Sequence, residues 1–212
     1  MIYRIKEVAI VSYSTFSLED IETQLGLSIQ ATQNPLTHAE TCSVSESLRE
    51  ILDYNLPLAL EIATEKARSE MILTPILIEL KKIFDSKISL FSGREFNVDP
   101  DQGLVGFCDF LISQSPSQLI IKSPVIIIIE AKNDNIQSGL GQCIAAMYAA
   151  QIFNQRQGNA IAEIYGSVTT GTNWKFLKLV NKIVEIDVRE YFLNDLGLIL
   201  SILKSFISLE NQ

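Results

Sequence analysis

A run of apolar residues that ends in a glutamate and a lysine constrains this chain more than any other feature. Residues 124–132 read Pro-Val-Ile-Ile-Ile-Ile-Glu-Ala-Lys. Five apolar, mostly β-branched residues in a row are typical of a strand buried on both faces of a sheet. Because side chains alternate along a strand, we expect Glu130 and Lys132 to point to the same side. Such charges are costly to desolvate, so they need partners or a chemical task.

A second acidic strand is predicted just upstream. Asp109 lies in the middle of the apolar run of residues 104–112, and residues 113–117 form a polar, turn-forming stretch before the next strand. Two neighbouring strands of this kind would bring Asp109 close to Glu130 and Lys132. Carboxylate oxygens are the ligands that Mg²⁺ prefers. We therefore expect Asp109 and Glu130 to share one cation site.

With these residues on two strands, the chain resembles the PD-(D/E)XK nuclease superfamily. The motif is carried by Asp109 and by residues 130–132, Glu-Ala-Lys, with Cys108 where the motif has its proline. Upstream, Glu70 in residues 69–77 resembles the glutamate on the first helix of that superfamily. Downstream, Gln142 resembles the helix glutamine found in many members. The resemblance covers residues 66–190, in the right order.

This resemblance implies a restriction-endonuclease-like core, which is an α/β fold with a central mixed β-sheet flanked by helices. It also implies Mg²⁺ as the cofactor, with Mn²⁺ as a substitute. The metal ligands would be Asp109, Glu130 and the backbone carbonyl of Ala131. The implied activity is metal-dependent hydrolysis of DNA phosphodiester bonds, by an endonuclease or an exonuclease.

Three further residues receive catalytic roles from the same resemblance. Lys132 would orient the attacking water and stabilise the charge that builds on the phosphate. Gln142 would fix Lys132 or the phosphate. Glu70 would hold a second metal ion or a metal-bound water.

The net charge of −8 is unusual for a protein that binds nucleic acid, because such proteins usually carry a basic surface. The charge is unevenly distributed. Residues 1–65 hold ten acidic and three basic residues, whereas residues 66–212 hold fifteen and fourteen. We predict an acidic, helical N-terminal extension over residues 1–65, packed on the core and away from nucleic acid. The nuclease-like domain is predicted over residues 66–212.

Two other functions stay open at this point. One is a PD-(D/E)XK-like fold that no longer cuts and serves as a binding or assembly module, which the acidic leading segment favours. The other is a nuclease that is active only within a larger complex that supplies the DNA contacts. The oligomeric state, a homodimer or a larger complex, is likewise open.

Localisation and redox state follow from simple patterns. No apolar run approaches the ~20 residues of a membrane span, and residues 1–7 do not start a signal peptide. Three scattered cysteines predict reduced thiols rather than a disulfide framework. The single histidine, His38, argues against His-based triads and His-rich metal sites. We therefore expect a cytoplasmic protein without a membrane partner.

Periodicity and capping signals predict the remaining elements. Helices are expected to start at Ser17, at a capping box in residues 43–46 and at Pro57, and Pro75 is expected to kink or divide the stretch that ends near residue 84. Residues 30–41 are polar and are predicted to form a loop. Two later helices are predicted over residues 136–153 and 191–209. Strands are predicted over residues 2–13, 87–97, 104–113, 123–132, 160–169, 175–180 and 183–187.

Overall fold

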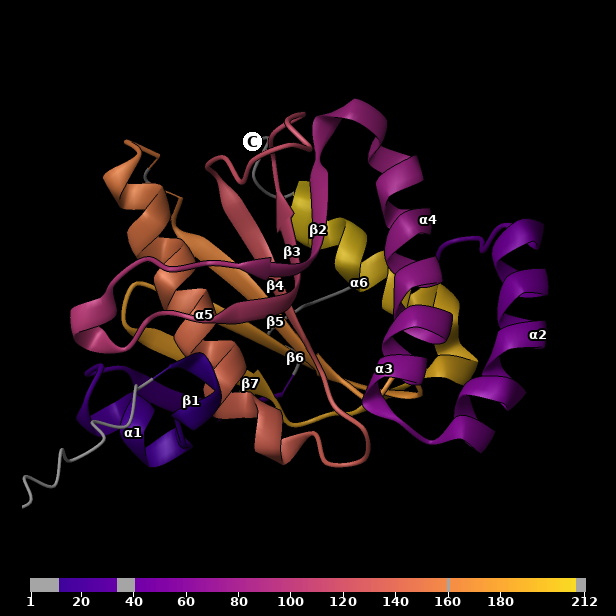
Figure 1. The fold of residues 1–212 in the computed structure, drawn as a ribbon, viewed down its shortest axis with the longest axis horizontal. Coiled ribbons are helices and arrows are strands. Elements are labelled where there is room, and N and C mark those ends of the chain that lie inside the picture. The colour runs from indigo at the N-terminus through magenta and orange to yellow at the C-terminus, as the bar shows by residue number, and fades with distance from the viewer. Residues whose placement is uncertain (1–11, 34–40, 160, 209–212) are drawn as a thin grey trace, which may run out of the picture.

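The computed structural model describes residues 12–33, 41–159 and 161–208 (Figure 1). Within these residues, the centre of the molecule is an eight-stranded mixed sheet in the order β1-β7-β6-β5-β4-β3-β2, with β8 pairing to β6. Helices cover both faces of this open sheet, so the predicted α/β class with a central mixed sheet is confirmed. The strands are β1 (Ser28–Thr32), β2 (Ser89–Glu95), β3 (Phe107–Ser113), β4 (Val125–Ala131), β5 (Glu163–Thr169), β6 (Asn173–Val180), β7 (Ile183–Asp187) and β8 (Tyr191–Phe192).

Strand β4 sits in the middle of the sheet, between β3 and β5. It pairs antiparallel with β3 and parallel with β5. The parallel pair needs a crossover connection, which is helix α5 (Gln137–Arg156) packed on β4 and β5. All seven residues of β4 are buried, as the apolar run predicts. The functional candidates at its carboxyl end therefore stand on a central, doubly covered strand.

The helices form two layers, one on each face of the sheet. The turn η1 (Tyr13–Thr15), α1 (Leu18–Thr23) and α5 share one apolar core with the sheet. The other core is shared by α2 (Glu46–Ile62), the π-helical turn η2 (Ser69–Leu73), α4 (Thr74–Phe84) and α6 (Leu196–Ser208). Helix α2 is the outermost element of that second layer (Figure 1). No helix in the described ranges is long and apolar enough to cross a membrane.

Local sequence signals explain most helix boundaries. The Ser17 and Ser45 side chains each accept a hydrogen bond from the backbone N–H three residues on, which caps α1 and α2. The start predicted at Ser17 is confirmed, whereas α2 starts later than predicted because Ser45, not Ser43, is its N-cap. Pro75 lies in the first turn of α4, and the carbonyl oxygen of Met71, four residues before it, accepts a hydrogen bond from the side chain of Asn55 instead. The π-helical η2 changes to α4 next to Pro75, but Leu73 and Thr74 keep right-handed helical backbone angles, so the helical stretch is not interrupted there.

Two predicted boundaries are wrong. Residues 30–41 were expected to form a loop, but Ser28–Thr32 is β1, paired parallel to β7 at the edge of the sheet. Its exposed, mostly polar side chains lack the alternation that marks a half-buried strand. Pro57 was expected to start a helix, but it lies inside α2. Packing of α2 on η2 and α4 outweighs the hydrogen bond that this proline cannot make.

The two ends of the chain also differ from their predictions. Tyr191–Phe192 forms β8 and the closing helix α6 begins only at Leu196. Of the strand predicted over residues 2–13, residues 2–11 lie outside the described residues, and Tyr13 belongs to η1 instead. The hydroxyl of Tyr13 donates to the backbone carbonyl oxygens of Phe96 and Leu104, which anchors this leading segment on the core.

The contact between α5 and the start of α1 depends on a glycine. A Cβ atom at Gly141 would lie 2.0 Å from the carbonyl oxygen of Phe16 and 2.8 Å from its carbonyl carbon. Because these are backbone atoms, they cannot move aside by changing a rotamer. Gly141→Ala should therefore lower the free energy of unfolding by about 1–3 kcal/mol, measured by urea denaturation. Gln155→Ala, at an exposed position of α5, is the control; equal stability of the two variants would contradict this packing.

Candidate functional site

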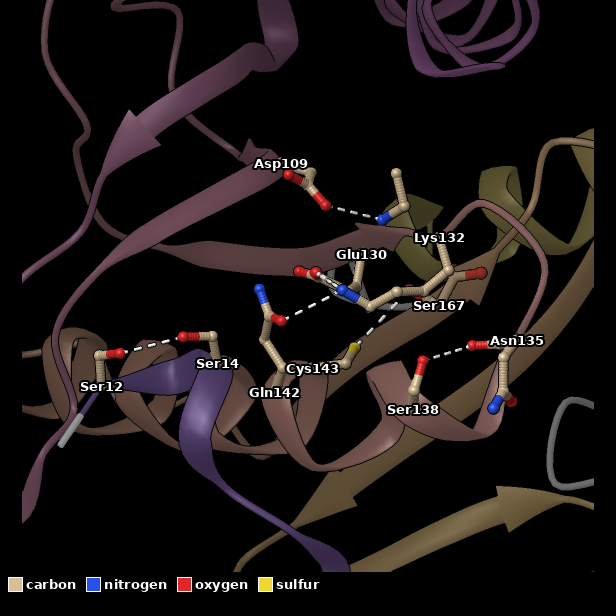
Figure 2. A network of polar contacts seen from close by, with 11 residues as sticks. Ser12, Ser14, Asp109, Glu130, Lys132, Asn135, Ser138, Gln142, Cys143 and Ser167 are labelled. Atoms are coloured by element: carbon tan, nitrogen blue, oxygen red, sulfur yellow. Dashed lines mark hydrogen bonds and ion pairs between the residues drawn. The ribbon is translucent and has the colours of Figure 1, made fainter. Parts of the chain in front are cut away.

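The charged residues at the carboxyl end of β4 are paired with each other. Lys132 Nζ lies 2.7 Å from Glu130 Oε1, and the side chain of Glu130 is only 4% exposed. The two side chains are on the same side of the strand, as alternation predicts. Figure 2 shows the Lys132 ammonium and the Glu130 carboxylate pointing toward one another. A buried carboxylate therefore receives its cation from the same strand.

Helix α5 contributes the third member of this group. Lys132 Nζ donates to Gln142 Oε1 at 3.2 Å, so the ammonium group bridges a carboxylate and an amide (Figure 2). The helix can come this close because Gly139 faces the lysine. A Cβ atom at Gly139 would lie 2.9 Å from Lys132 Cε and 2.7 Å from a methyl group of Val168. The structure thus brings together Glu130, Lys132 and Gln142.

Asp109 joins the group from β3. Asp109 Oδ2 accepts a hydrogen bond from the backbone N–H of Ala131 at 2.8 Å. The backbone ladder between β3 and β4 reaches Phe110 and Ile129. Asp109 follows at the end of this ladder, where its side chain rather than its backbone bonds β4. The carboxylate is therefore held at the end of β4 by a hydrogen bond that does not depend on any ion.

Burial and like charge both act on Glu130. Burial raises the pKa of its carboxyl group most, the neighbouring Asp109 carboxylate raises it further, and Lys132 lowers it, with a resulting pKa of about 8. For Lys132, burial lowers the pKa, but Glu130, Glu65 and Asp109 together raise it above its usual range. The two carboxyl groups are close enough to repel each other, and one ammonium group offsets this only in part.

A cavity of about 240 Å³ opens beside this group. Its lining combines acidic, hydroxyl and backbone groups from the helical layer and from β2, β3 and β4: Glu65, Lys66, Ser69, Glu70, Thr74, Ser92, Gly93, Asp109 and Ala131. Asp109 and Ala131 thus face open space as well as the Glu130 group. Oxygen atoms dominate the side chains of this lining, which suits a hard cation.

Glu70 lies at the cavity but apart from the buried group. Its carboxylate is 2.9 Å from Lys66 Nζ, four residues earlier, and both side chains are mostly exposed. Among the described residues, no cluster of three or more His, Cys, Asp or Glu side chains that could hold a metal ion is present. The acidic groups that the structure brings together at the end of β4 are the two carboxyl groups of Asp109 and Glu130.

Sequence reasoning missed Glu65 and Gly139. Glu65 is the first residue of α3 (Glu65–Arg68), lines the cavity and is close enough to Lys132 to raise its pKa. The sequence signal that could have located Glu65 is Thr64, which marks the start of α3. Its side chain caps this helix by accepting a hydrogen bond from the backbone N–H of Ala67. Gly139 left no comparable signal, since only the packing of α5 on β4 shows that a side chain there would meet Lys132.

The cysteines are free thiols, as their spacing predicts. Cys108 is buried, and burial raises the pKa of its thiol well above its usual range, with Glu130 and Asp109 adding to the effect. Cys143 on α5 is fully buried and its pKa is raised for the same first reason. Neither thiol is prepared to act as a nucleophile, because neither ionises near neutral pH.

Comparison with known proteins finds no family model that matches this chain and no match among curated proteins.

The raised pKa of Glu130 predicts how stability depends on pH. The carboxyl group has a pKa of about 8 when folded and about 4.5 when unfolded, so between these values the folded protein holds a proton that the unfolded chain releases. The stabilisation is complete below pH 4.5 and is lost as the pH rises to about 8, by up to about 1.4 kcal/mol per pH unit. Glu130→Gln, which mimics the protonated form, should flatten this decline in urea denaturation series. The same slope in both proteins would contradict the raised pKa.

The contact between Gly139 and Lys132 predicts that a substitution at Gly139 changes the pKa of Glu130. Gly139→Ala should displace the lysine stem and weaken its contact with Glu130, which removes a factor that lowers the pKa of Glu130. Carbon-13 NMR titration of the Glu130 carboxyl group should then report a higher pKa than in the parent protein. Ser138→Ala, at the exposed preceding position, serves as the control. An unchanged pKa in Gly139→Ala would show that Lys132 is not held by this packing.

Proposed function

We propose that this protein is a Mg²⁺-dependent nuclease that hydrolyses DNA phosphodiester bonds and has a restriction-endonuclease-like core of the PD-(D/E)XK type. The order of elements supports this proposal: a helix, the three strands β2 to β4, the helix α5 and further strands. Asp109 on β3 and residues 130–132 at the carboxyl end of β4 lie on neighbouring strands of that order.

One observation carries the proposal. Lys132 contacts both Glu130 and Gln142, while Asp109 bonds the backbone of the residue between Glu130 and Lys132. Four side chains, from β3, from the end of β4 and from α5, thus meet at the end of one buried strand, beside a cavity. A structural ion pair alone would need neither the second carboxylate nor the glutamine from α5.

The residues fit a magnesium ion. Burial and the neighbouring Asp109 carboxylate both oppose ionisation of Glu130, and a divalent cation would offset both effects. Mg²⁺ usually binds through one or two carboxylates and keeps several waters, so a third acidic ligand is not required. The Ala131 carbonyl would be the backbone ligand, since Ala131 lines the cavity together with Asp109. Mn²⁺, which favours the same oxygen ligands, would substitute.

When bound, the metal would supply a more acidic water and neutralise charge on the phosphate. The chain's own residues would position the water and the phosphate. Lys132 would hold the attacking water in line and stabilise the negative charge that builds on the phosphate as the P–O bond breaks. Gln142 would keep the ammonium group in position. Glu70, and also Glu65, would contact metal-bound water from the far side of the cavity.

A second candidate is a non-catalytic binding or assembly module on the same core. The observation that favours it is that Lys132, from the chain itself, already pairs with Glu130. The net charge of −8 points the same way, since phosphate contacts would have to overcome it. The two candidates differ in whether Lys132 acts on a substrate or only on Glu130.

Lys132→Ala separates these candidates. For the nuclease, plasmid nicking should fall by about 10²–10³-fold, while Mg²⁺ binding, measured by calorimetry, persists because ammonium is not a Mg²⁺ ligand. For the module, no nicking is expected from parent or variant, and the effect is a loss of stability that stays below the ~3–5 kcal/mol of an unpaired buried charge because Glu130 takes up a proton. Lys87→Ala, at an exposed site, is the control.

Asp109→Asn tests the metal site without breaking the fold. An amide oxygen still accepts the hydrogen bond from Ala131, but the charge is lost. Mg²⁺ affinity should fall while the melting temperature of the metal-free protein stays the same or rises. A parent protein that nicks no DNA with either Mg²⁺ or Mn²⁺ would leave the module as the function.

A further inference from the structure

Helix α2 carries an apolar stripe on its outer side. Ile51, Tyr54, Leu58 and Ile62 are 41%, 78%, 40% and 45% exposed. They are spaced three, four and four residues apart, so they lie on one face of the helix over about three turns. Single exposed apolar residues are ordinary, but a continuous row along a helix indicates a surface that is covered by something else.

The described residues do not cover this stripe. Helix α2 buries a different set of side chains, Leu48, Leu52 and Ala59, against the second core. Its neighbours there are η2, α3 and α4. On its other side α2 is the outermost element of the molecule (Figure 1). The helix is thus packed along one side and presents a second apolar face to the surroundings.

Acidic residues border the stripe. Glu50 lies four residues before Tyr54, and Glu61 lies three residues after Leu58, so each is a surface neighbour of an apolar residue. Asp53 lies three residues after Glu50 and extends this acidic edge on the side away from the stripe. Together with Glu46, these residues give α2 four acidic side chains against one basic one, Arg49. The ion pairs found among the described residues involve none of these side chains.

The acidic residues beside the stripe determine which kind of partner can bind there. A second copy of this chain would bring its own net charge of −8, with the same acidic helix, against this one. An anionic membrane and a nucleic-acid backbone are repelled for the same reason. A helix whose apolar face is flanked by lysine or arginine complements both the stripe and its border. Helix-on-helix docking of this kind uses anchors at the spacing found here.

We propose that α2 is the docking site for a basic amphipathic helix of a partner protein. Ile51, Tyr54, Leu58 and Ile62 supply the apolar contact, and Glu50, Asp53 and Glu61 pair with basic residues at the rim. The site is adjacent to the cavity, because α2 leads through Thr64 into α3, whose Glu65 and Lys66 line it. A partner held on α2 places its basic residues beside that cavity.

Two designed peptides test this site. One is a helical peptide of leucine and lysine, about 18 residues long, and the other has the same leucine pattern with glutamate in place of lysine. Fluorescence anisotropy with the full chain should show binding of the basic peptide only. Its affinity should fall several-fold as salt rises from about 0.05 to about 0.5 M. Equal binding of both peptides would overturn the proposal.

Matched variants show whether binding occurs on α2. Leu58→Ser, and separately the pair Glu50→Lys with Asp53→Lys, should each weaken binding about tenfold or more. The pair Glu95→Lys with Asp101→Lys makes the same change in net charge at exposed sites away from α2 and should weaken it much less. Circular dichroism confirms that each variant is folded.

Two results would overturn the proposal. One is an equal loss of affinity in the two charge-reversed pairs, which would mean that binding follows net charge alone. The other is a dimer of the parent protein, measured by light scattering, that Leu58→Ser converts to monomers. That result would make a second copy the occupant of this face.

Discussion

Glu130 and Asp109 place two carboxyl groups at the end of a strand whose seven residues are all buried. Such a pair is tolerated only with compensation, because burial and like charge both oppose ionisation. Here the compensation comes from Lys132, two residues along the same strand, and from the backbone N–H of Ala131. The packing around the end of β4 reflects this need to compensate the two carboxyl groups. Helix α5 must come close enough to offer Gln142, and a glycine at position 139 lets it do so.

The two faces of the sheet serve this site differently. On the α5 side, the helix packs directly on β4 and β5, and small residues such as Gly139, Gly141 and the buried alanines allow that close approach. On the other side, α3 and η2 stand off from the strand ends and leave a cavity between Glu70 and Asp109. One face therefore holds the charged group rigidly, while the other gives it access to solvent. A site that binds an ion or a phosphate needs both properties.

The uneven charge of the chain has a structural counterpart. Much of the acidic charge of residues 1–65 lies on α2, whose free side combines carboxylates with exposed apolar residues. The remainder of the chain is close to neutral, so the cavity is not surrounded by the basic surface of a strong DNA binder. A protein with this distribution gains most from a partner of opposite charge. The cavity site and the α2 docking site consist of different residues, so each can be tested without the other.

The sequence by itself determined the central elements and one half of the site. Five apolar, mostly β-branched residues before Glu130 predicted a buried strand, and alternation put Glu130 and Lys132 on the same side of it. The alanine-rich stretch before residue 153 predicted α5, and its glutamine does reach Lys132. These features depend on local periodicity, which a sequence records directly.

Tertiary packing decided the rest. Tertiary contacts determine the hydrogen bond from Ala131 to Asp109 and the effect of Glu65 on the pKa of Lys132. They also determine the pairing of the polar strand β1 with β7 and the continuation of α2 through Pro57. Contacts between residues far apart in the chain leave no periodic trace, so only the folded structure could show them.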